Sequence, residues 1–397
     1  MATNGKAYGG RWALVVCAAA AIAITVAWPR HDEPEYAGKP LSEWLLITCG
    51  GLQPRPSPED MSQASRAVQH IGTNALPYLL KWISHERPAP TFVQNIVGKL
   101  PFNLCSSVLF RWLYEDKGEL RAALAVEGFE NLGTNAESAL PELERMARSA
   151  MPSGYARGNL VQAIASCGPR ALPVLFEELG NNNQGDRHVI VSLLGITKWP
   201  DNSVVVPCLI SNVEDRSSAV RLASLRALGA KASESSVAFE ALLQCLNHTN
   251  AAVRHASTLA LGDLGRAAAA AIPALTDVIR SSEDGRQISD SVYALEQIAT
   301  NASVAVPALV GLLRDSQDAR LRAMAARALA SYADAAASAI PELFAALDDP
   351  DESVIKACRQ TLWVIAPNEI PEEWKQNVDY PFEARYLSHG QGRYAAR

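Results

Sequence analysis

The sequence is poor in aromatic residues and carries no excess of basic charge. Aromatic side chains make up 7% of its 397 residues, and 42 acidic against 36 basic residues leave a formal net charge of −6. Ala and Leu supply much of the apolar surface, a mixture that favours closely packed helices over sheets. Nucleic-acid binding requires a strongly positive surface. We therefore predict a mainly helical protein that does not bind nucleic acid.

Sequence patterns that carry enzyme chemistry are also missing. There is no G-x-S-x-G motif, Walker loop or dinucleotide-binding fingerprint. The seven cysteines include no C-x-x-C pair, and the histidines show no H-x-x-x-H spacing. We predict that the protein is not an enzyme and has no catalytic residue, metal or cofactor. Cys245 and Cys358 fall at core positions of expected helices, so they are expected to be buried free thiols.

One long uncharged run stands near the N-terminus, at residues 12–28, after Lys6 and Arg11. As a helix it would span about 25 Å, close to the roughly 30 Å core of a bilayer. Basic residues before such a run predict a cytoplasmic N-terminus and an extracytoplasmic (periplasmic) body. We expect residues 1–36 to form a signal anchor, which is a membrane-spanning segment, and a linker. Two alternatives are a secreted protein with a signal peptide cleaved at Thr25-Val26-Ala27, and a buried helix of a cytosolic protein.

The strongest signal is an internal repeat. Segments such as AIPALTDVI (271–279) and AVPALVGLL (305–313) recur, and degenerate copies lie around Ser107 and Phe239. The anchor residues are Pro77, Ser107, Pro141, Pro173, Pro207, Phe239, Pro273, Pro307 and Pro341, at spacings of 30, 34, 32, 34, 32, 34, 34 and 34 residues. Proline suits the first turn of a helix, where its missing N–H is not needed. Each anchor therefore predicts the start of a helix, here called a proline helix.

An amphipathic, Ala-rich helix is predicted upstream of each anchor, here called an alanine helix. The clearest cover 219–230, 252–265, 319–333 and 353–366. Their expected N-caps include Asn250, Asp318 and Asp351. The glycines that follow Leu228 and Leu132 are expected to end their helices. A hairpin of about 33 residues cannot bury its apolar faces alone, so the repeats must stack.

These motifs identify a resemblance to a known repeat family. Val220-Arg221 and Val253-Arg254 match V-R-x-A, Ala227-Leu228-Gly229 matches A-L-G, and the anchors match A-x-P-x-L. Together they resemble HEAT repeats of the short bacterial, phycobilisome-lyase-like form, over residues 61–366. The resemblance implies an all-α, right-handed superhelical solenoid of about nine hairpins. It also implies a ladder of loop aspartates with helix arginines, Asp215 with Arg221 and Asp315 with Arg322.

The two ends are expected to cover the open faces of the stack. Residues 37–60 are predicted to form an N-terminal cap helix, with Trp44 and Leu45 on the first repeat, followed by a Pro-rich loop. Residues 367–397 are predicted to form a C-terminal capping tail.

Known enzymes of similar build carry motifs that are incomplete or missing in this sequence. Deoxyhypusine hydroxylases hold iron through several His-Glu pairs, whereas this chain has one, His85-Glu86. Alkylpurine DNA glycosylases use a basic groove, which the acidic balance disfavours, and no residue here can be matched to a bilin lyase site. None of these activities is therefore carried over, because the repeat specifies a fold rather than a function.

The resemblance implies that the proline helices line the concave surface. Their outward side chains would then form the candidate protein-binding face: Lys81, Glu142, Arg145, Glu177, Glu240, Asp277 and Glu342. Five acids and two bases predict a mildly acidic groove for a basic or mixed-charge protein segment. The alternative is a solvated helix face with no partner.

Three functions follow, in order of support. The first is a non-catalytic protein-interaction scaffold, tethered to the membrane through residues 12–28, with an unknown protein partner. The second is a cofactor-handling or lyase-like enzyme, which a cluster of His, Cys or acidic residues in the groove would favour. The third is a cytosolic regulator, which requires residues 12–28 to pack on the repeats.

Overall fold

The computed structural model describes residues 33–50, 56–84, 117–149, 155–181 and 186–371. The chain divides into two compact units, residues 1–190 and 191–397, and each is described by itself. The predicted membrane segment, the copy around Ser107 and the tail from residue 372 lie outside the described residues. Within the described ranges, no helix is long and apolar enough to cross a bilayer.

The first unit begins with a short antiparallel ribbon, β1 (Glu35–Tyr36) and β2 (Lys39–Pro40), followed by helices. These helices are α2 (Leu41–Thr48), α3 (Pro58–Ile71), α4 (Leu76–Ile83), α8 (Lys117–Leu132), α9 (Leu140–Arg148), α10 (Tyr155–Ser166) and α11 (Leu172–Gly180). Helix α2 packs against α3, with Trp44 and Leu45 buried. The Trp44 indole N–H donates to the Tyr36 carbonyl at 3.0 Å, which fixes the ribbon on this helix.

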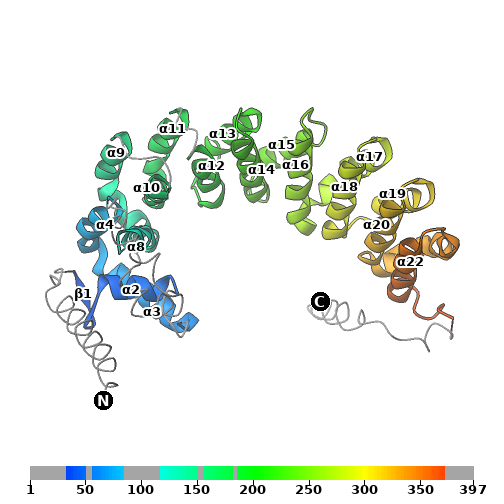
Figure 1. Ribbon diagram of the computed structural model, residues 1–397, viewed down its shortest axis with the longest axis horizontal. Coiled ribbons are helices and arrows are strands. Elements are labelled where there is room, and N and C mark those ends of the chain that lie inside the picture. Colours follow the sequence, from blue (N-terminus) through cyan, green and yellow to red (C-terminus); the bar gives the residue numbers. More distant parts are fainter. Residues whose placement is uncertain (1–32, 51–55, 85–116, 150–154, 182–185, 372–397) are drawn as a thin grey trace, which may run out of the picture. The chain divides into compact units, whose positions relative to one another are not determined.

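The second unit is a row of helical hairpins (Figure 1). Its helices are α13 (Val205–Ser211), α14 (Ser218–Ala232), α15 (Ser236–Cys245), α16 (Ala251–Asp263), α17 (Ile272–Ser281), α18 (Gly285–Ile298), α19 (Ala302–Asp315), α20 (Ala319–Ala330), α21 (Ile340–Ala345) and α22 (Glu352–Ile365). Helix α12 (Arg187–Ile196) runs across the division between the units. The alternation of alanine and proline helices confirms the predicted all-α solenoid fold.

Many helices begin where the sequence has a capping side chain or a proline. The side chains of Asn250, Asp318 and Asp351 accept hydrogen bonds from the first turns of α16, α20 and α22, as predicted. Proline stands in the first turn of α4, α9, α11, α17 and α21. Helix α19 differs because it begins at Ala302, which places Pro307 inside it. The missing N–H of Pro307 therefore costs α19 one backbone hydrogen bond.

The two glycines expected to end helices behave differently. Gly133 has a φ of 54° and follows the last residue of α8, as predicted. The prediction for Gly229 is wrong, because α14 continues to Ala232. A Cβ on Gly229 would lie 3.0 Å from the Cβ of Ala260. Gly229 is therefore a contact residue between alanine helices rather than a helix stop.

Close packing of the alanine helices sets the curvature of the second unit. A Cβ on Gly195 would lie 2.6 Å from the Cα of Ala227, and one on Gly262 would lie 3.1 Å from the Cα of Ala294. Helices joined through glycine and alanine approach more closely than helices joined through larger side chains. In Figure 1 the proline helices α13, α15, α17 and α19 accordingly lie on the outer side of the row, and the alanine helices line its inner side.

The cysteines of the described segments are free thiols. Cys245 and Cys358 are buried, as predicted, and so is Cys167. Burial raises the pKa of Cys167 and Cys358 to about 12. These thiols therefore remain protonated near neutral pH and act as small apolar core residues.

Candidate functional site

Two of the predicted binding residues of the second unit lie on helices of its outer row. Glu240 and Asp277 are exposed on α15 and α17, which belong to the outer row, and Glu342 is half-buried on α21. The sequence-based assignment exchanged the two rows. It took the proline helices for the inner row, whereas the small residues of the alanine helices bring those helices to the inside.

In the first unit the predicted residues are largely engaged with one another. Lys81 is exposed on α4. Glu142 pairs with Arg145 on α9 at 2.5 Å, and Glu177 of α11 pairs with Arg148 at 3.0 Å. In the second unit Asp277 similarly lies 3.6 Å from Arg280. Neighbouring arginines outside the predicted set therefore neutralise some of its five acids. A binding role for these seven residues stays a prediction.

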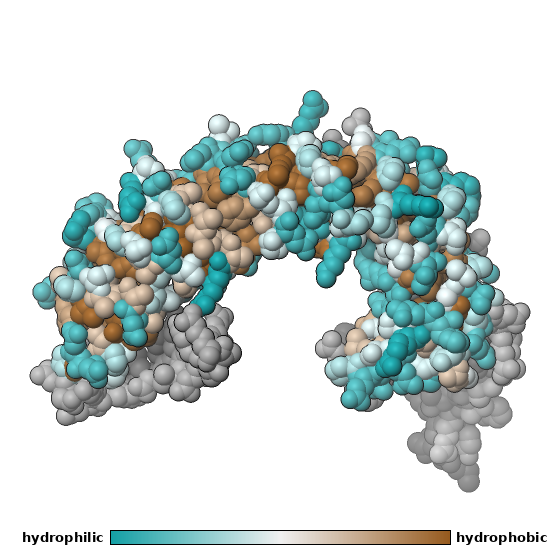
Figure 2. Space-filling model, turned by 180° about the vertical axis from the view of Figure 1, so that it is seen from behind, coloured by the Kyte–Doolittle hydropathy of each residue, from teal (hydrophilic) through white to brown (hydrophobic). Residues whose placement is uncertain are grey.

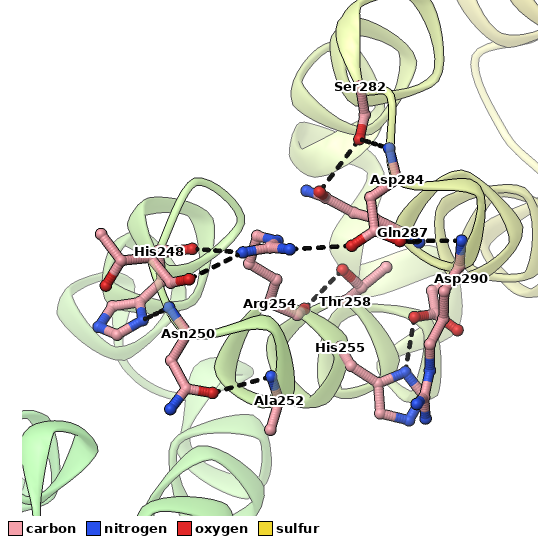
Figure 3. Close-up of polar contacts among 12 residues, drawn as sticks. His248, Asn250, Ala252, Arg254, His255, Thr258, Ser282, Asp284, Gln287 and Asp290 are labelled. Carbon is pink, nitrogen blue, oxygen red and sulfur yellow. Dashed lines mark hydrogen bonds and ion pairs between the residues drawn. The ribbon is translucent and has the colours of Figure 1, made fainter.

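A polar cluster joins α16 to α18 through Arg254 (Figure 3). The Arg254 Nη1 donates to the carbonyls of His248 and Thr249 at 2.9 and 3.1 Å, and its Nη2 donates to the Asp284 carboxylate at 2.9 Å. Asp284 in turn caps the first turn of α18. Arg254 therefore ties the loop before its own helix to the start of the next alanine helix. Beside it, His255 Nδ1 lies 2.6 Å from Asp290 Oδ2.

Arg322 repeats this arrangement two hairpins later. It donates to the Ser316 carbonyl at 3.0 Å and to both carboxylate oxygens of Asp349 at 2.7 and 2.8 Å. The predicted pair with Asp315 is wrong, because Asp315 pairs with Arg314 at 2.8 Å. Arg254 and Arg322 therefore each bind the loop before their own helix through backbone carbonyls and the loop that follows their hairpin through a carboxylate.

The loop that follows the hairpin of Arg221 contains no carboxylate, and among the described residues Arg221 binds backbone carbonyls only. It donates to the backbone carbonyls of Asp215 and Arg216 at 2.8 and 3.1 Å. The Asp215 carboxylate instead accepts from the Ser217 backbone N–H at 2.8 Å, so the predicted Asp215–Arg221 side-chain pair is also wrong. The N-cap of the next alanine helix, α16, is Asn250, whereas the N-cap of α18 is Asp284. The loop after the hairpin of Arg221 therefore ends in an amide, where the loop after the hairpin of Arg254 ends in a carboxylate. These arginines hold the repeats together and are not free to bind a partner.

The Arg322–Asp349 pair predicts a pH dependence of stability. The Arg322 guanidinium holds the pKa of Asp349 below its ordinary value, so the charged pair stabilises the fold above about pH 4 and this stabilisation is lost on acidification. Asp349→Asn should lower the free energy of unfolding by about 1–3 kcal/mol near pH 7. The difference from the unchanged protein should shrink as the pH falls towards about 2. Urea unfolding at several pH values measures this, and a difference that does not change with pH would contradict it.

Other cations lie on the exposed side of the alanine helices. Arg286 and Tyr293 are two turns apart on α18, and Arg320 and Arg327 are two turns apart on α20, so each pair shares one helix face. With Arg226 of α14 and Lys356 of α22, these exposed residues form what we call the inner face of the second unit. Figure 2 shows hydrophilic side chains extending from this inner edge.

The inner face has an excess of positive charge. Among the described residues, Arg226, Arg286, Arg320 and Lys356 make no ion pair, in contrast to Arg254 and Arg322. The acidic residues on this side are Asp263 and Glu352, which are exposed, Asp290, which pairs with His255, and the half-buried Glu296. Burial raises the pKa of Glu296, and the charge of Arg327 opposes that shift.

The sequence carries a signal for this face on the alanine helices rather than on the proline helices. The seven-residue spacing of Arg320 and Arg327 marks one face of a predicted alanine helix, whereas the seven predicted binding residues all belong to proline helices. In the described part of the chain, no group of three or more His, Cys, Asp or Glu residues could hold a metal ion.

Comparison with known proteins gives one family match. A sequence model of the family described as HEAT repeats matches residues 206–296 and 272–363. No match was found among curated protein sequences.

Solved structures give distant similarities. The chain is 21% identical to an engineered protein, covering 57% of this chain and 96% of the other with a TM-score of 0.31. It is 19% identical to human deoxyhypusine hydroxylase in complex with glycerol, covering 58% and 96% with a TM-score of 0.28. It is 12% identical to importin beta, covering 82% of this chain and 55% of that one with a TM-score of 0.41. The repeat assignment therefore depends on the family match and the observed hairpins.

Proposed function

Because residues 206–363 form HEAT repeats, we propose that this protein is a non-catalytic scaffold that binds another protein through the inner face of its second unit. One observation carries the proposal. Arg226, Arg286, Arg320 and Lys356 are exposed and make no ion pair among the described residues, in a unit where Arg254 and Arg322 join the repeats. Unpaired charges on a row of adjacent helices have no evident role in the fold and are well placed to contact a partner.

Site-specific photo-crosslinking in the native host tests this proposal. A photoreactive residue at Tyr293 or Leu259, both on alanine helices, should give a discrete crosslinked protein. The same residue at Asp277 or Glu240, which are exposed on the outer row, is the matched control. Crosslinks at the inner positions alone would support a scaffold. Equal crosslinking at inner and outer positions, or none, would refute it.

The scaffold is proposed to be tethered to the membrane with its body outside the cytoplasm. The uncharged run of residues 12–28 behind Lys6 and Arg11 supports this placement. Protease protection with N-terminal sequencing tests it. An intact N-terminus in the membrane fraction, with the body digested from the outer side, is the expected result. A full-length, protected, soluble product would instead favour the cytosolic regulator.

A further inference from the structure

We propose that the inner face binds an extended, acidic segment of its partner through Arg286, Arg320, Arg327 and Lys356. These residues lie on three consecutive alanine helices, α18, α20 and α22, and define what we call the basic cluster. The inference rests on the proposed scaffold function and specifies the chemistry of its partner.

The positions of two of these cations have no evident structural advantage. Arg286 and Arg320 lie in the first turns of α18 and α20. The N-terminal end of a helix carries partial positive charge, so a cation there is disfavoured. Neither side chain makes an ion pair among the described residues. The N-cap carboxylates of Asp284 and Asp318 lie at the same helix ends and offset part of this repulsion, so it is the exposure of the two guanidinium groups and their lack of an ion pair within the described ranges that indicate a ligand.

The other residues of this face indicate a protein ligand rather than nucleic acid. Tyr293 is 39% exposed on α18, and Met324 is half-buried on α20, so apolar contacts are available beside the cations. The exposed carboxylates of Asp263 and Glu352 would repel a continuous phosphate backbone, and the whole chain is negatively charged. A peptide with spaced carboxylates can place its neutral residues opposite those acids.

The spacing of the alanine helices predicts how far apart the acidic residues of the bound segment lie. Packed helices lie about 8–10 Å apart, and an extended chain advances about 3.3 Å per residue. A segment that crosses α18, α20 and α22 would therefore present an acidic residue to each helix at about every third position. We expect Asp or Glu at every third position, with apolar residues between them that contact Tyr293 and Met324.

Fluorescence anisotropy with the full chain in a nonionic detergent tests this inference. The probe is a labelled peptide with Asp at every third position and Leu and Ser between, and the comparison probes are a peptide with Lys in place of Asp and single-stranded DNA. The Asp peptide should bind most tightly, and its affinity should fall as salt is raised. Tighter binding of the DNA or of the Lys peptide would overturn the inference.

Paired charge reversals identify the surface. Arg286→Glu with Arg320→Glu should weaken binding of the Asp peptide at least about tenfold, because two attractions become repulsions. The matched control, Arg280→Glu with Arg314→Glu, changes exposed arginines of the proline helices α17 and α19 and should leave affinity within about twofold. Equal effects of the two variants would overturn the inference. If the reversed protein unfolds, Arg286→Gln with Arg320→Gln should still weaken binding several-fold.

The two proposals fail in different ways. If the Asp peptide does not bind but Tyr293 still crosslinks a partner in cells, the acidic-segment inference is wrong and the scaffold stands. If no inner position crosslinks a protein, the scaffold proposal itself is wrong.

Discussion

Replacing Arg157 with alanine is expected to destabilise the first unit by about 3–5 kcal/mol. Arg157 lies on α10 and is 6% exposed. Its guanidinium forms an ion pair with the buried carboxylate of Glu178 on α11, and its Nε lies 3.6 Å from Asp186 Oδ2. That Asp186 oxygen is buried, and no donor among the described residues forms a hydrogen bond with it. Alanine would leave two buried carboxylates without a cation, which is far more costly than losing an exposed pair.

The first unit provides a matched control for Arg157. Arg145 also pairs with a glutamate, Glu142, but its side chain is 69% exposed. Arg145→Ala should leave the urea midpoint of unfolding unchanged, because an exposed pair contributes little. Urea titrations followed by circular dichroism measure both variants. Equal midpoints for Arg157→Ala and Arg145→Ala would show that the buried pair does not stabilise the unit.

The second large effect is expected at Gly195, where alanine should destabilise the second unit by about 1–3 kcal/mol. Alanine has a higher helix propensity than glycine, by about 1 kcal/mol, so a stabilised protein would be expected from α12 alone. The added methyl, however, would lie 2.6 Å from the Cα of Ala227, and backbone atoms cannot yield as a flexible side chain can. We expect the steric cost to exceed the gain in propensity, because α12 and α14 would have to move apart.

Gly311 gives the control for this substitution. It lies inside α19 on the outer row, and in the described part of the chain no atom lies within 4 Å of a Cβ placed there. Gly311→Ala should therefore stabilise the protein, by up to about 1 kcal/mol. Opposite shifts in thermal unfolding temperature for the two variants are the expected result. A stabilised Gly195→Ala protein would contradict the account of how the alanine helices set the curvature.

Features that depend on neighbouring residues in the sequence could be predicted. The capping side chains of Asn250, Asp318 and Asp351 and the proline spacing locate helix starts, because they act within one turn of chain. The repeat period then gives the solenoid fold, because a hairpin of that length must stack on its neighbours.

Features that depend on the distance between helices were harder to predict. Gly229 was assigned as a helix stop on local grounds, and only its contact with Ala260 shows that it permits close approach. The close contacts between alanine helices also place these helices on the inner side of the second unit. The exposed charges of the alanine helices therefore form the candidate site. The arginine ladder depends on the same geometry, because the partner of Arg322 is Asp349, in the loop that follows its hairpin.

The most direct test of the central claim combines crosslinking with charge reversal. The yield of the partner crosslinked at Tyr293 is measured in cells that carry Arg286→Glu with Arg320→Glu, or the outer-row control Arg280→Glu with Arg314→Glu. The account predicts that the crosslink is lost in the first variant and kept in the second. If the crosslink persists in both, or disappears from both folded proteins, the inner face of the second unit is not the binding surface.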